Sequence, residues 1–506
     1  MNIKNCIIII LSGVLFASCE LEGDLNDGSE VSSTAVQELL NGAYSGLRDL
    51  QPQDNLLALT THTSDEMAGP TRGSDWDDAG VWRVLHTHSW TAVHPYVENV
   101  WTIAGRNSFN AQQVICADAT ESESAQAVFL RAFSDFILLD NFGFYQRREC
   151  GSSISEAPGL IARADAATSL IAELEAALPD LPTSGAPEVA TQDAARVLLM
   201  KLYLNKAVYE TVDDQGAPLA GPYNFDATDM DRVIQLADQV SGYSLDEDYF
   251  DNFVPNNSDA SSELIFVSAN TDGGASGVIR SRWHMTLHYN QNPDGWNGFV
   301  ALADLYNLFE QEDSRRRTDL DYFADNNSGL NAGFLVGQQF DGNGNPLEDR
   351  LQNPLVFTPE FELLETGSDL EVAGIRAIKY IPDFPNTDDL SDNDFVFFRY
   401  ADVVLMKAEA ILRGGTSGDN ALDLVNDLRS IRGASDLGSI DLDGVLDERA
   451  RELYWEGWRR NDQIRFNTFL GTWQQKDNTS GLERLLFPIP VLSLATNPNL
   501  EQNPGY

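Results

Sequence analysis

Apolar residues recur at helical spacing through the first half of the chain. From Val36 to Leu47 they recur at alternating steps of three and one, which is the pattern of an amphipathic helix with Ser and Thr at its start. Similar stripes predict helices over 96–116, 122–141, 163–178, 191–210 and 228–240. Pro179 and Pro182 end one of them, because proline breaks the helical hydrogen-bond ladder. A helical scaffold is therefore expected over 31–240.

The last part of the chain repeats this pattern. Apolar residues form one stripe between Phe397 and Leu412 and another between Ala450 and Trp458. The helices have the rough spacing of helix–turn–helix pairs but no fixed sequence period, so a degenerate helical array is expected. The sequence predicts a C-terminal helical region over 397–506.

Two segments interrupt the helical texture. Between 241 and 396, short runs such as "ELIFVS" and "NPLVFT" are separated by turns rich in Gly, Asn and Asp, such as "DGGASG" and "DGNGNP". This composition predicts a loop-rich insertion with a few short strands. A second irregular segment spans 51–95, within the N-terminal scaffold. The fold class expected from these patterns is mainly α.

The N-terminus resembles the signal of a bacterial lipoprotein. One lysine precedes an apolar run from Ile7 to Ala17, which is too short to span a bilayer and is typical of a secretion signal. The run ends in a lipobox-like cysteine, Cys19, which would become the first mature residue and carry lipid. We therefore expect a signal peptide over 1–18 and a flexible acidic leader over 19–30.

The charge balance excludes two classes of partner. The 506 residues include 78 acidic and 33 basic residues, which gives a formal net charge of −45. Such a field repels nucleic acid and anionic lipid headgroups, so neither is expected as a partner. Once Cys6 leaves with the signal and Cys19 carries lipid, Cys116 and Cys150 remain. They could form a disulfide or be two buried thiols, and the sequence leaves both open.

Several motifs then resemble one family along essentially the whole mature chain and in the right order. They are "AQAVFLRAFSDFILLDNFG" (125–143), "GWNGFVALADLYNLFEQEDSRRR" (295–317), "FFRYADVVLMKAEAILRGG" (397–415), "NDLRSIRG" (426–433), "ERARELYWEGWRRNDQIRF" (448–466) and "LFPIPVLSLATNPNLEQNPGY" (486–506). These are similar to SusD/RagB proteins, which are outer-membrane lipoproteins of Bacteroidetes. The resemblance implies tetratricopeptide-like helix pairs overlaid by a loop-built glycan site. It also implies a non-catalytic lid, without a cofactor, that passes oligosaccharide to a SusC-like TonB-dependent transporter. The acidic residues behind Cys19 resemble signals that send such lipoproteins to the cell surface.

Aromatic residues are concentrated in the two irregular regions. Six of nine tryptophans and all six histidines fall within His62–Trp101 and Trp283–Trp296. A sugar ring presents C–H bonds that pack on an aromatic face, while its hydroxyls need polar partners. Loops in these same two regions form the glycan site of the family that the chain resembles. The candidate ligand-binding residues are Trp76, Trp82, Trp283, Trp296, Tyr289, Asp65, Arg72 and His284.

Each candidate has a plainer structural interpretation. Loop packing explains Trp76 and Trp82 about as well as stacking does, and Trp296 could simply anchor the helix that follows it. Loop hydrogen bonds explain Asp65 and Arg72 about as well as contacts with sugar hydroxyls do. The remaining tryptophans lie in or near helical stretches and are expected in the core; they are Trp90, Trp101, Trp455, Trp458 and Trp473.

Metal ions are not expected. The pairs His86/His88 and His284/His288 would each share one face of a strand or helix, but they match no zinc pattern of the family. The segment 341–350 begins like a calcium loop, yet Pro346 stands where glycine is required, so a turn between strands is favoured.

Three functions compete. A neutral glycan, such as a β-glucan or mannan, is favoured as cargo because the aromatic regions hold few cations. A peptide or other nutrient is an alternative cargo, since relatives of the RagB type have non-glycan ligands. An enzyme acting on the glycan would need two opposed carboxylates. Three glutamates on one predicted helix face could imitate such a pair, but neighbouring arginines favour ion pairs instead; these glutamates are Glu448, Glu452 and Glu456.

Overall fold

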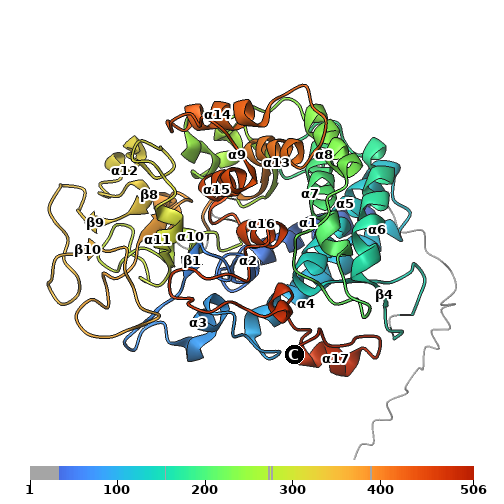
Figure 1. The fold of residues 1–506 in the computed structure, drawn as a ribbon, viewed down its shortest axis with the longest axis horizontal. Coiled ribbons are helices and arrows are strands. Elements are labelled where there is room, and N and C mark those ends of the chain that lie inside the picture. The colour runs from blue at the N-terminus through green and yellow to red at the C-terminus, as the bar shows by residue number, and fades with distance from the viewer. Residues whose placement is uncertain (1–32, 154, 272–273, 275–276, 388–389) are drawn as a thin grey trace, which may run out of the picture.

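A stack of long helices forms one side of the protein (Figure 1). The structure is a computed structural model and describes residues 33–153, 155–271, 274, 277–387 and 390–506. Each helix of the stack packs on the next in sequence. The stack consists of α4 (Pro95–Ile115), α5 (Glu121–Phe142), α6 (Arg163–Ala177), α7 (Gln192–Glu210) and α8 (Ala227–Gln239). The apolar stripes predicted all five, with ends displaced by at most one residue.

Local signals explain where these helices begin and end. Thr120 caps α5 with a capping box, in which its hydroxyl accepts from the Glu123 N–H and the Glu123 carboxylate accepts from the Thr120 N–H. Thr191 caps α7 and Asp226 caps α8 in the simpler way. Gly143 ends α5 in the left-handed conformation, with φ 89°.

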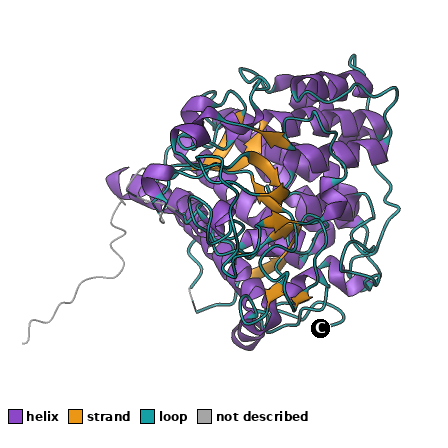
Figure 2. Ribbon diagram, turned by 90° about the vertical axis from the view of Figure 1, so that its left-hand side faces the viewer, coloured by secondary structure: helices purple, strands orange, loops and turns teal. Residues whose placement is uncertain are grey.

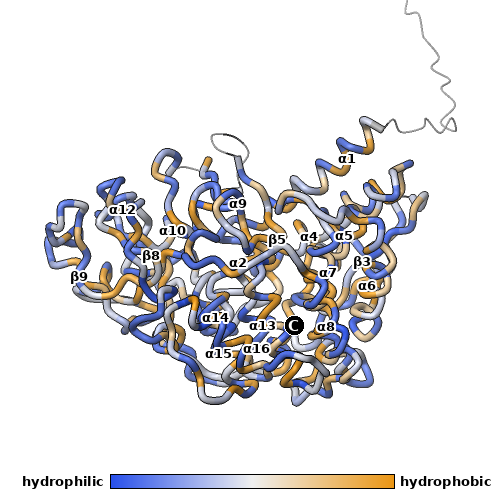
Figure 3. Tube along the Cα trace, turned by 90° about the horizontal axis from the view of Figure 1, so that it is seen from above, coloured by the Kyte–Doolittle hydropathy of each residue, from blue (hydrophilic) through white to orange (hydrophobic). Residues whose placement is uncertain are grey.

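Helix α1 (Ser33–Ser45) packs on α4 and α5. Its buried residues, Val36, Leu40 and Ala43, fall on the stripe that predicted the helix. Figure 3 shows α1 at the margin of the molecule, with hydrophobic and hydrophilic positions alternating along it. The expected signal peptide, Cys19 and the acidic leader lie outside the described residues. Among the helices that the structure describes, none combines the length and apolarity needed to cross a membrane.

Four C-terminal helices close the top and centre of the molecule in Figure 1. They are α13 (Tyr400–Leu412), α14 (Ala421–Ile431), α15 (Leu442–Leu453) and α16 (Arg459–Arg465). Helix α13 packs on α7 and α8 of the stack and on α14 and α15. The sequence pattern predicted one continuous helix across Ala450–Trp458, and this is wrong. The helix ends at Leu453, Trp455 has φ 58°, and its N–H and indole N–H donate to the carboxylate and carbonyl of Glu66 instead of continuing the helix.

Buried ion pairs hold the C-terminal helices to the rest of the chain. The glutamates of α15 do form ion pairs, as predicted, but mostly with arginines from other elements. Glu452 pairs with Arg315, Arg399 and Arg432, while Glu448 also pairs with its neighbour Arg451. These groups are buried and mutually satisfied, so they cross-link the fold and are not free for acid–base catalysis.

Short strands occur in the insertion and also in the N-terminal region, at 67–72 and 145–161. In Figure 2 the strands run between helical layers. The longest pair is antiparallel, β5 (Leu264–Ser268) with β13 (Phe395–Arg399), and β8 (Ala332–Leu335) pairs with β12 (Arg376–Ile378) and β7 (Arg317–Thr318). Two-residue or three-residue strands make the other pairs: β1 (Met67–Ala68) with β6 (Val300–Ala301), β2 (Thr71–Arg72) with β11 (Leu364–Glu365), β9 (Gly337–Gln338) with β10 (Val356–Phe357), and β3 (Tyr145–Arg147) with β4 (Gly159–Ile161).

The remaining α-helices are short. They are α2 (Leu56–Thr60), α3 (Val81–His86), α9 (Asn257–Ala260), α10 (Ser281–His284), α11 (Ala303–Tyr306), α12 (Asp321–Asp325) and α17 (Val491–Thr496). A strand would have placed His86 and His88 on one face. Instead, His86 is the last residue of α3, and His88 lies in the turn that follows.

A hairpin between β9 and β10 contains the predicted turn. The Asp341 carboxylate accepts from the backbone N–H of Asn343 and Asn345, and Asp349 repeats this arrangement with Leu351 and Asn353. Each aspartate thus closes a tight turn through its own backbone. The turn between strands is confirmed.

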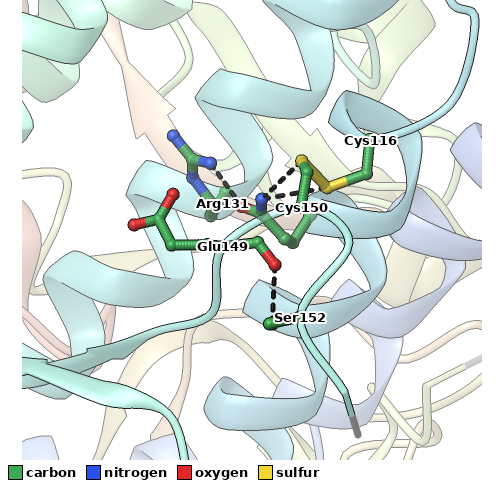
Figure 4. The surroundings of a disulfide bond; sticks show 6 residues. Cys116, Arg131, Glu149, Cys150 and Ser152 are labelled. Atoms are coloured by element: carbon green, nitrogen blue, oxygen red, sulfur yellow. Dashed lines mark hydrogen bonds between the residues drawn. A yellow bond between two sulfur atoms is a disulfide. The ribbon is translucent and has the colours of Figure 1, made fainter.

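Cys116 and Cys150 form a disulfide, which decides the alternative that the sequence left open. Figure 4 shows the bond between the end of α4 and the loop after β3. The Gln112 side chain donates to both sulfur atoms and accepts from Arg131. The bond therefore ties the 148–153 loop to the helical stack.

Candidate functional site

Two loops that are distant in sequence form one groove of about 480 Å³. One loop precedes α3, and the other follows α10. The groove has an aromatic lining and an acidic rim, and we call it the aromatic groove. Its aromatic residues are Trp76, Trp82, Tyr96, Tyr289 and Trp296, and its acidic residues are Asp54, Asp75 and Asp78.

The two loops are locked together by Trp76. Its indole Nε1 donates to the backbone oxygen of Trp296 over 2.7 Å, and the two ring centroids lie 6.5 Å apart at 55°. A Cβ atom at Gly298 would lie 2.3 Å from carbons of the Trp76 ring, so only glycine fits there. This explains the local sequence "GWNGF": Trp296 lies at the groove and Gly298 makes room for Trp76.

Several residues with strained backbone conformations lie in the two loops of the aromatic groove. Trp76, Asp78 and Ala79 have φ values of 59°, 39° and 52°, and Asn297 in the facing loop has φ 54°. A side chain in this region costs about 1–2 kcal/mol relative to ordinary backbone. Such residues cluster where the surrounding structure holds a functional surface in place. The strain is thus a second, independent feature of this groove.

Trp82 forms the floor of the groove and is only 3 % exposed. Its ring packs on Tyr96 and Phe299, and its Nε1 donates to Asp78 over 3.0 Å. Of the two interpretations left open for Trp82, stacking on a ligand and loop packing, its low exposure favours packing. It supports Trp76 from behind, at a centroid distance of 6.4 Å.

Tyr289 forms a wall of the groove. Its hydroxyl donates to Asp75 over 3.3 Å, and the Arg350 guanidinium lies over its ring, 3.9 Å from the centroid. Arg350 also donates to Asp75 over 2.9 Å and to Glu371. These contacts hold the ring between the 336–358 hairpin and the loop that carries Trp76.

The structure removes two further expected residues from the groove. Trp283 is fully buried, and its Nε1 has no hydrogen-bond partner among the described residues, so it belongs to the core. Asp65 pairs with Arg459 over 2.7 and 2.8 Å. A buried guanidinium needs such a counterion. The ion pair with Arg459 therefore accounts for Asp65, and no contact with a ligand is needed to explain it.

Arg72 and His284 have supporting positions. Arg72 is 4 % exposed and donates to the carbonyl oxygens of Leu370 and Ala373, and burial lowers its pKa to about 10. The His284 ring contacts the edge of Trp296 with centroids 4.9 Å apart, and its Nδ1 lies 3.1 Å from the Asp294 oxygen. Arg72 shapes the loop backbone, and His284 orients Trp296.

Most of the tryptophans predicted to be core are buried. Trp90, Trp101, Trp455 and Trp473 are at most 8 % exposed, whereas Trp458 is partly buried against the core.

The histidines serve packing in the same way. His86 and His88 hydrogen-bond to backbone oxygens of Gln474 and Thr63, while His288 bonds to Glu371. No group of three potential metal-ligating side chains occurs within the described part of the chain.

Sequence reasoning missed several groove residues. Asp75 and Asp78 flank Trp76 in "SDWDD", which was a readable signal. Tyr96 was read as part of a helix, and it does belong to α4 while also facing the groove. Arg350 is not in the groove lining but supports its Tyr289 wall, and it had no signal, because it approaches from a hairpin 54 residues beyond the second aromatic region.

The SusD family model matches residues 235–506, which is more than half of the chain. The chain belongs to the SusD family. The "Starch-binding protein SusD" of Bacteroides thetaiotaomicron is 37 % identical over 124 residues of this SusD-family chain. That match covers 23 % of the chain and 22 % of the starch-binding protein, so the chain aligns with about a fifth of its curated relative.

Solved structures match the whole fold. Surface glycan-binding protein A from Bacteroides fluxus has a TM-score of 0.69 at 19 % identity and covers 94 % of this chain and 100 % of its own. Surface glycan-binding protein A from Bacteroides thetaiotaomicron, in complex with laminarihexaose, has a TM-score of 0.66 at 16 % identity, with 93 % and 99 % covered. At these identities the likeness establishes the SusD fold.

Proposed function

We propose that this SusD-family protein captures a neutral oligosaccharide or polysaccharide in the aromatic groove. The observation that carries the proposal is the pairing of half-buried Trp76 with Trp296, which is 47 % exposed, above a rim of aspartates. Indole faces pack on the C–H bonds of a pyranose ring, and carboxylates accept from its hydroxyls. The starch-binding relative and the laminarihexaose complex support a glucan as ligand.

Charge favours a neutral glycan. The described residues that line the groove include Asp54, Asp75 and Asp78 but no lysine or arginine. A sulfated or uronic sugar would meet these carboxylates within a protein of net charge −45. Neutral glucans or mannans escape that repulsion, and their hydroxyls can donate to the carboxylate oxygens that remain available.

The hydrogen bonds of the groove favour binding over hydrolysis. Glycosidases need one free acid and one free base or nucleophile on opposite sides of the bond. Asp75 instead accepts from Tyr289 and Arg350, and Asp78 accepts from Trp82. These contacts of Asp75 and Asp78 support a role in holding the ligand rather than in cleaving it.

Delivery follows from the family. We infer that Cys19 carries lipid in the outer membrane and that the protein presents glycan to a SusC-like TonB-dependent transporter. Cys19→Ala should release the chain from the membrane fraction, whereas retained lipid labelling of this variant would contradict the anchor.

Affinity gels and calorimetry against laminarin, starch, mannan, a sulfated galactan and a mixed peptide digest test the cargo. Binding to at least one neutral polysaccharide, with no new reducing ends over hours, is the expected result. Binding to the peptide digest alone would make the protein a peptide lid, and sustained release of reducing ends would make it an enzyme.

A further inference from the structure

A second hollow of about 420 Å³ adjoins the aromatic groove. We call it the distal hollow; its own lining includes Arg350, Leu351, Ser368, Leu370 and Glu371. The two spaces share Ser74, Asp75 and Tyr289, so one wall separates them. No part of the function proposed above uses this space.

The shared wall is built and fixed. Arg350 lies on the Tyr289 ring and donates to Asp75, while its backbone N–H donates to Glu371 over 3.0 Å. Glu371 also accepts from His288 over 2.9 Å. The wall therefore joins four segments, which carry Asp75, Tyr289, Arg350 and Glu371, and it separates the two spaces at Tyr289.

The chemistry of the distal hollow resembles that of the aromatic groove. Leu351 is 66 % exposed and Leu370 is half-buried, so both offer apolar surface. The hydroxyl of exposed Ser368 and the carboxylate of Asp75 offer hydrogen bonds beside them. Arg350 and Arg72 already have partners in Glu371, Asp75 and backbone oxygens. Apolar patches beside neutral or acidic acceptors suit a polyhydroxylated, uncharged ligand.

We propose that the distal hollow is a second subsite for the same glycan chain, which continues past Tyr289 from the aromatic groove. This inference rests on the proposed function, and it adds a preference for long chains. A tenfold gain in affinity needs about 55 Å² of additional buried apolar surface. An exposed leucine and its neighbour supply an area of that order, so a hexasaccharide should bind about tenfold more tightly than a trisaccharide.

Calorimetry with laminaritriose and laminarihexaose tests the inference, or with maltotriose and maltohexaose if starch rather than laminarin binds. Ser368→Trp fills the distal hollow, and Thr366→Trp places the same ring on an exposed neighbour that lines neither space. Ser368→Trp should reduce hexasaccharide affinity to that of the trisaccharide and leave trisaccharide binding unchanged. Thr366→Trp should keep the length preference.

A second pair of variants tests the subsite by removing a side chain instead of introducing a large one. Leu351→Ala should weaken hexasaccharide binding, whereas Leu364→Ala, at a similarly exposed leucine outside both spaces, should not. Equal binding of short and long oligosaccharides, or an intact length preference in Ser368→Trp, would overturn the second subsite alone. Failure of every polysaccharide to bind would overturn the proposed function and the subsite together.

Discussion

Two tryptophans from the same aromatic region, Trp283 and Trp296, have opposite environments. Trp296→Ala removes a ring that is 47 % exposed, so it should weaken glycan binding about tenfold by analogy with other aromatic stacking. The melting temperature of Trp296→Ala should stay near that of the parent protein. Trp283→Ala removes a fully buried ring and should cost about 3–5 kcal/mol of unfolding free energy.

Calorimetry and thermal melting on both variants separate the two roles. Phe340→Ala is the control, because Phe340 is 45 % exposed but lines neither hollow. A loss of glycan affinity in Phe340→Ala as large as in Trp296→Ala would contradict a specific role for Trp296.

His62 lies behind the groove and makes the stability of the fold depend on pH. The ring is fully buried between Trp82 and Phe299, and neither nitrogen has a hydrogen-bond partner among the described residues. Burial lowers its pKa well below the usual value, and the nearby charges of His86 and Arg282 lower it further. Because the unfolded chain takes up this proton more readily, the contribution of neutral His62 to stability is complete above about pH 6.5 and declines below it.

His62→Phe should remove that acid sensitivity. At pH 7.5 its unfolding free energy should be close to that of the parent, since an apolar ring replaces an unpaired polar one. Below pH 6.5 the variant should gain about 1.4 kcal/mol per pH unit relative to the parent. Urea unfolding at pH 7.5, 6 and 5 measures this, and a difference that stays constant with pH would contradict the assignment.

At the scale of elements, the disulfide is a covalent constraint. It closes a segment with a sequence separation of 34 residues between α4 and the loop after β3. Cross-linking a loop of that length stabilises a protein by about 3–4 kcal/mol in the chain-entropy model. The double variant Cys116→Ser/Cys150→Ser should lose about this much unfolding free energy.

A reductant supplies the matched control for the disulfide. Reduction should lower the melting temperature of the parent and leave that of the double variant unchanged. Equal sensitivity of both proteins to reductant would mean that the bond does not constrain this segment.

The long helices were predictable because their signals are local. An apolar stripe and an N-cap such as Thr191 act within a few residues of the helix that they define. The end of α15 before Trp455 was not predictable, because Glu66, which accepts from the Trp455 N–H, lies 389 residues away in the sequence. Local patterns thus predict which segments form helices, whereas the end of a helix can depend on polar partners that are distant in the sequence.

At the scale of the whole molecule, a net charge of −45 should have little influence on binding if the ligand is neutral. No counterions are then displaced, and only dipoles and apolar faces meet. Glycan affinity should therefore change less than about twofold between 20 mM and 500 mM salt. A steep fall in affinity with salt would indicate a charged ligand, and a sulfated galactan titrated in parallel provides the comparison.

The site could be predicted in part. Irregular backbone and unusual aromatic content identified Trp76, Trp296 and Tyr289, which do line one groove. The same criteria could not distinguish Trp296 from Trp283, because burial depends on which other segment covers each ring. The role of Arg350 could not be predicted for a related reason, because it reaches Tyr289 from a separate hairpin.

The hydrogen bond from Trp76 to the Trp296 carbonyl spans 220 positions of sequence. Because each loop supplies half of the contact surface and Gly298 accommodates the ring of the opposite loop, neither loop is a self-contained module. Grafting one loop into another scaffold would transfer its tryptophan without the residues of the opposite loop that hold the ring in place. A change of ligand preference by recombination would require both loops to be exchanged together, whereas point substitutions on the rim could alter it step by step.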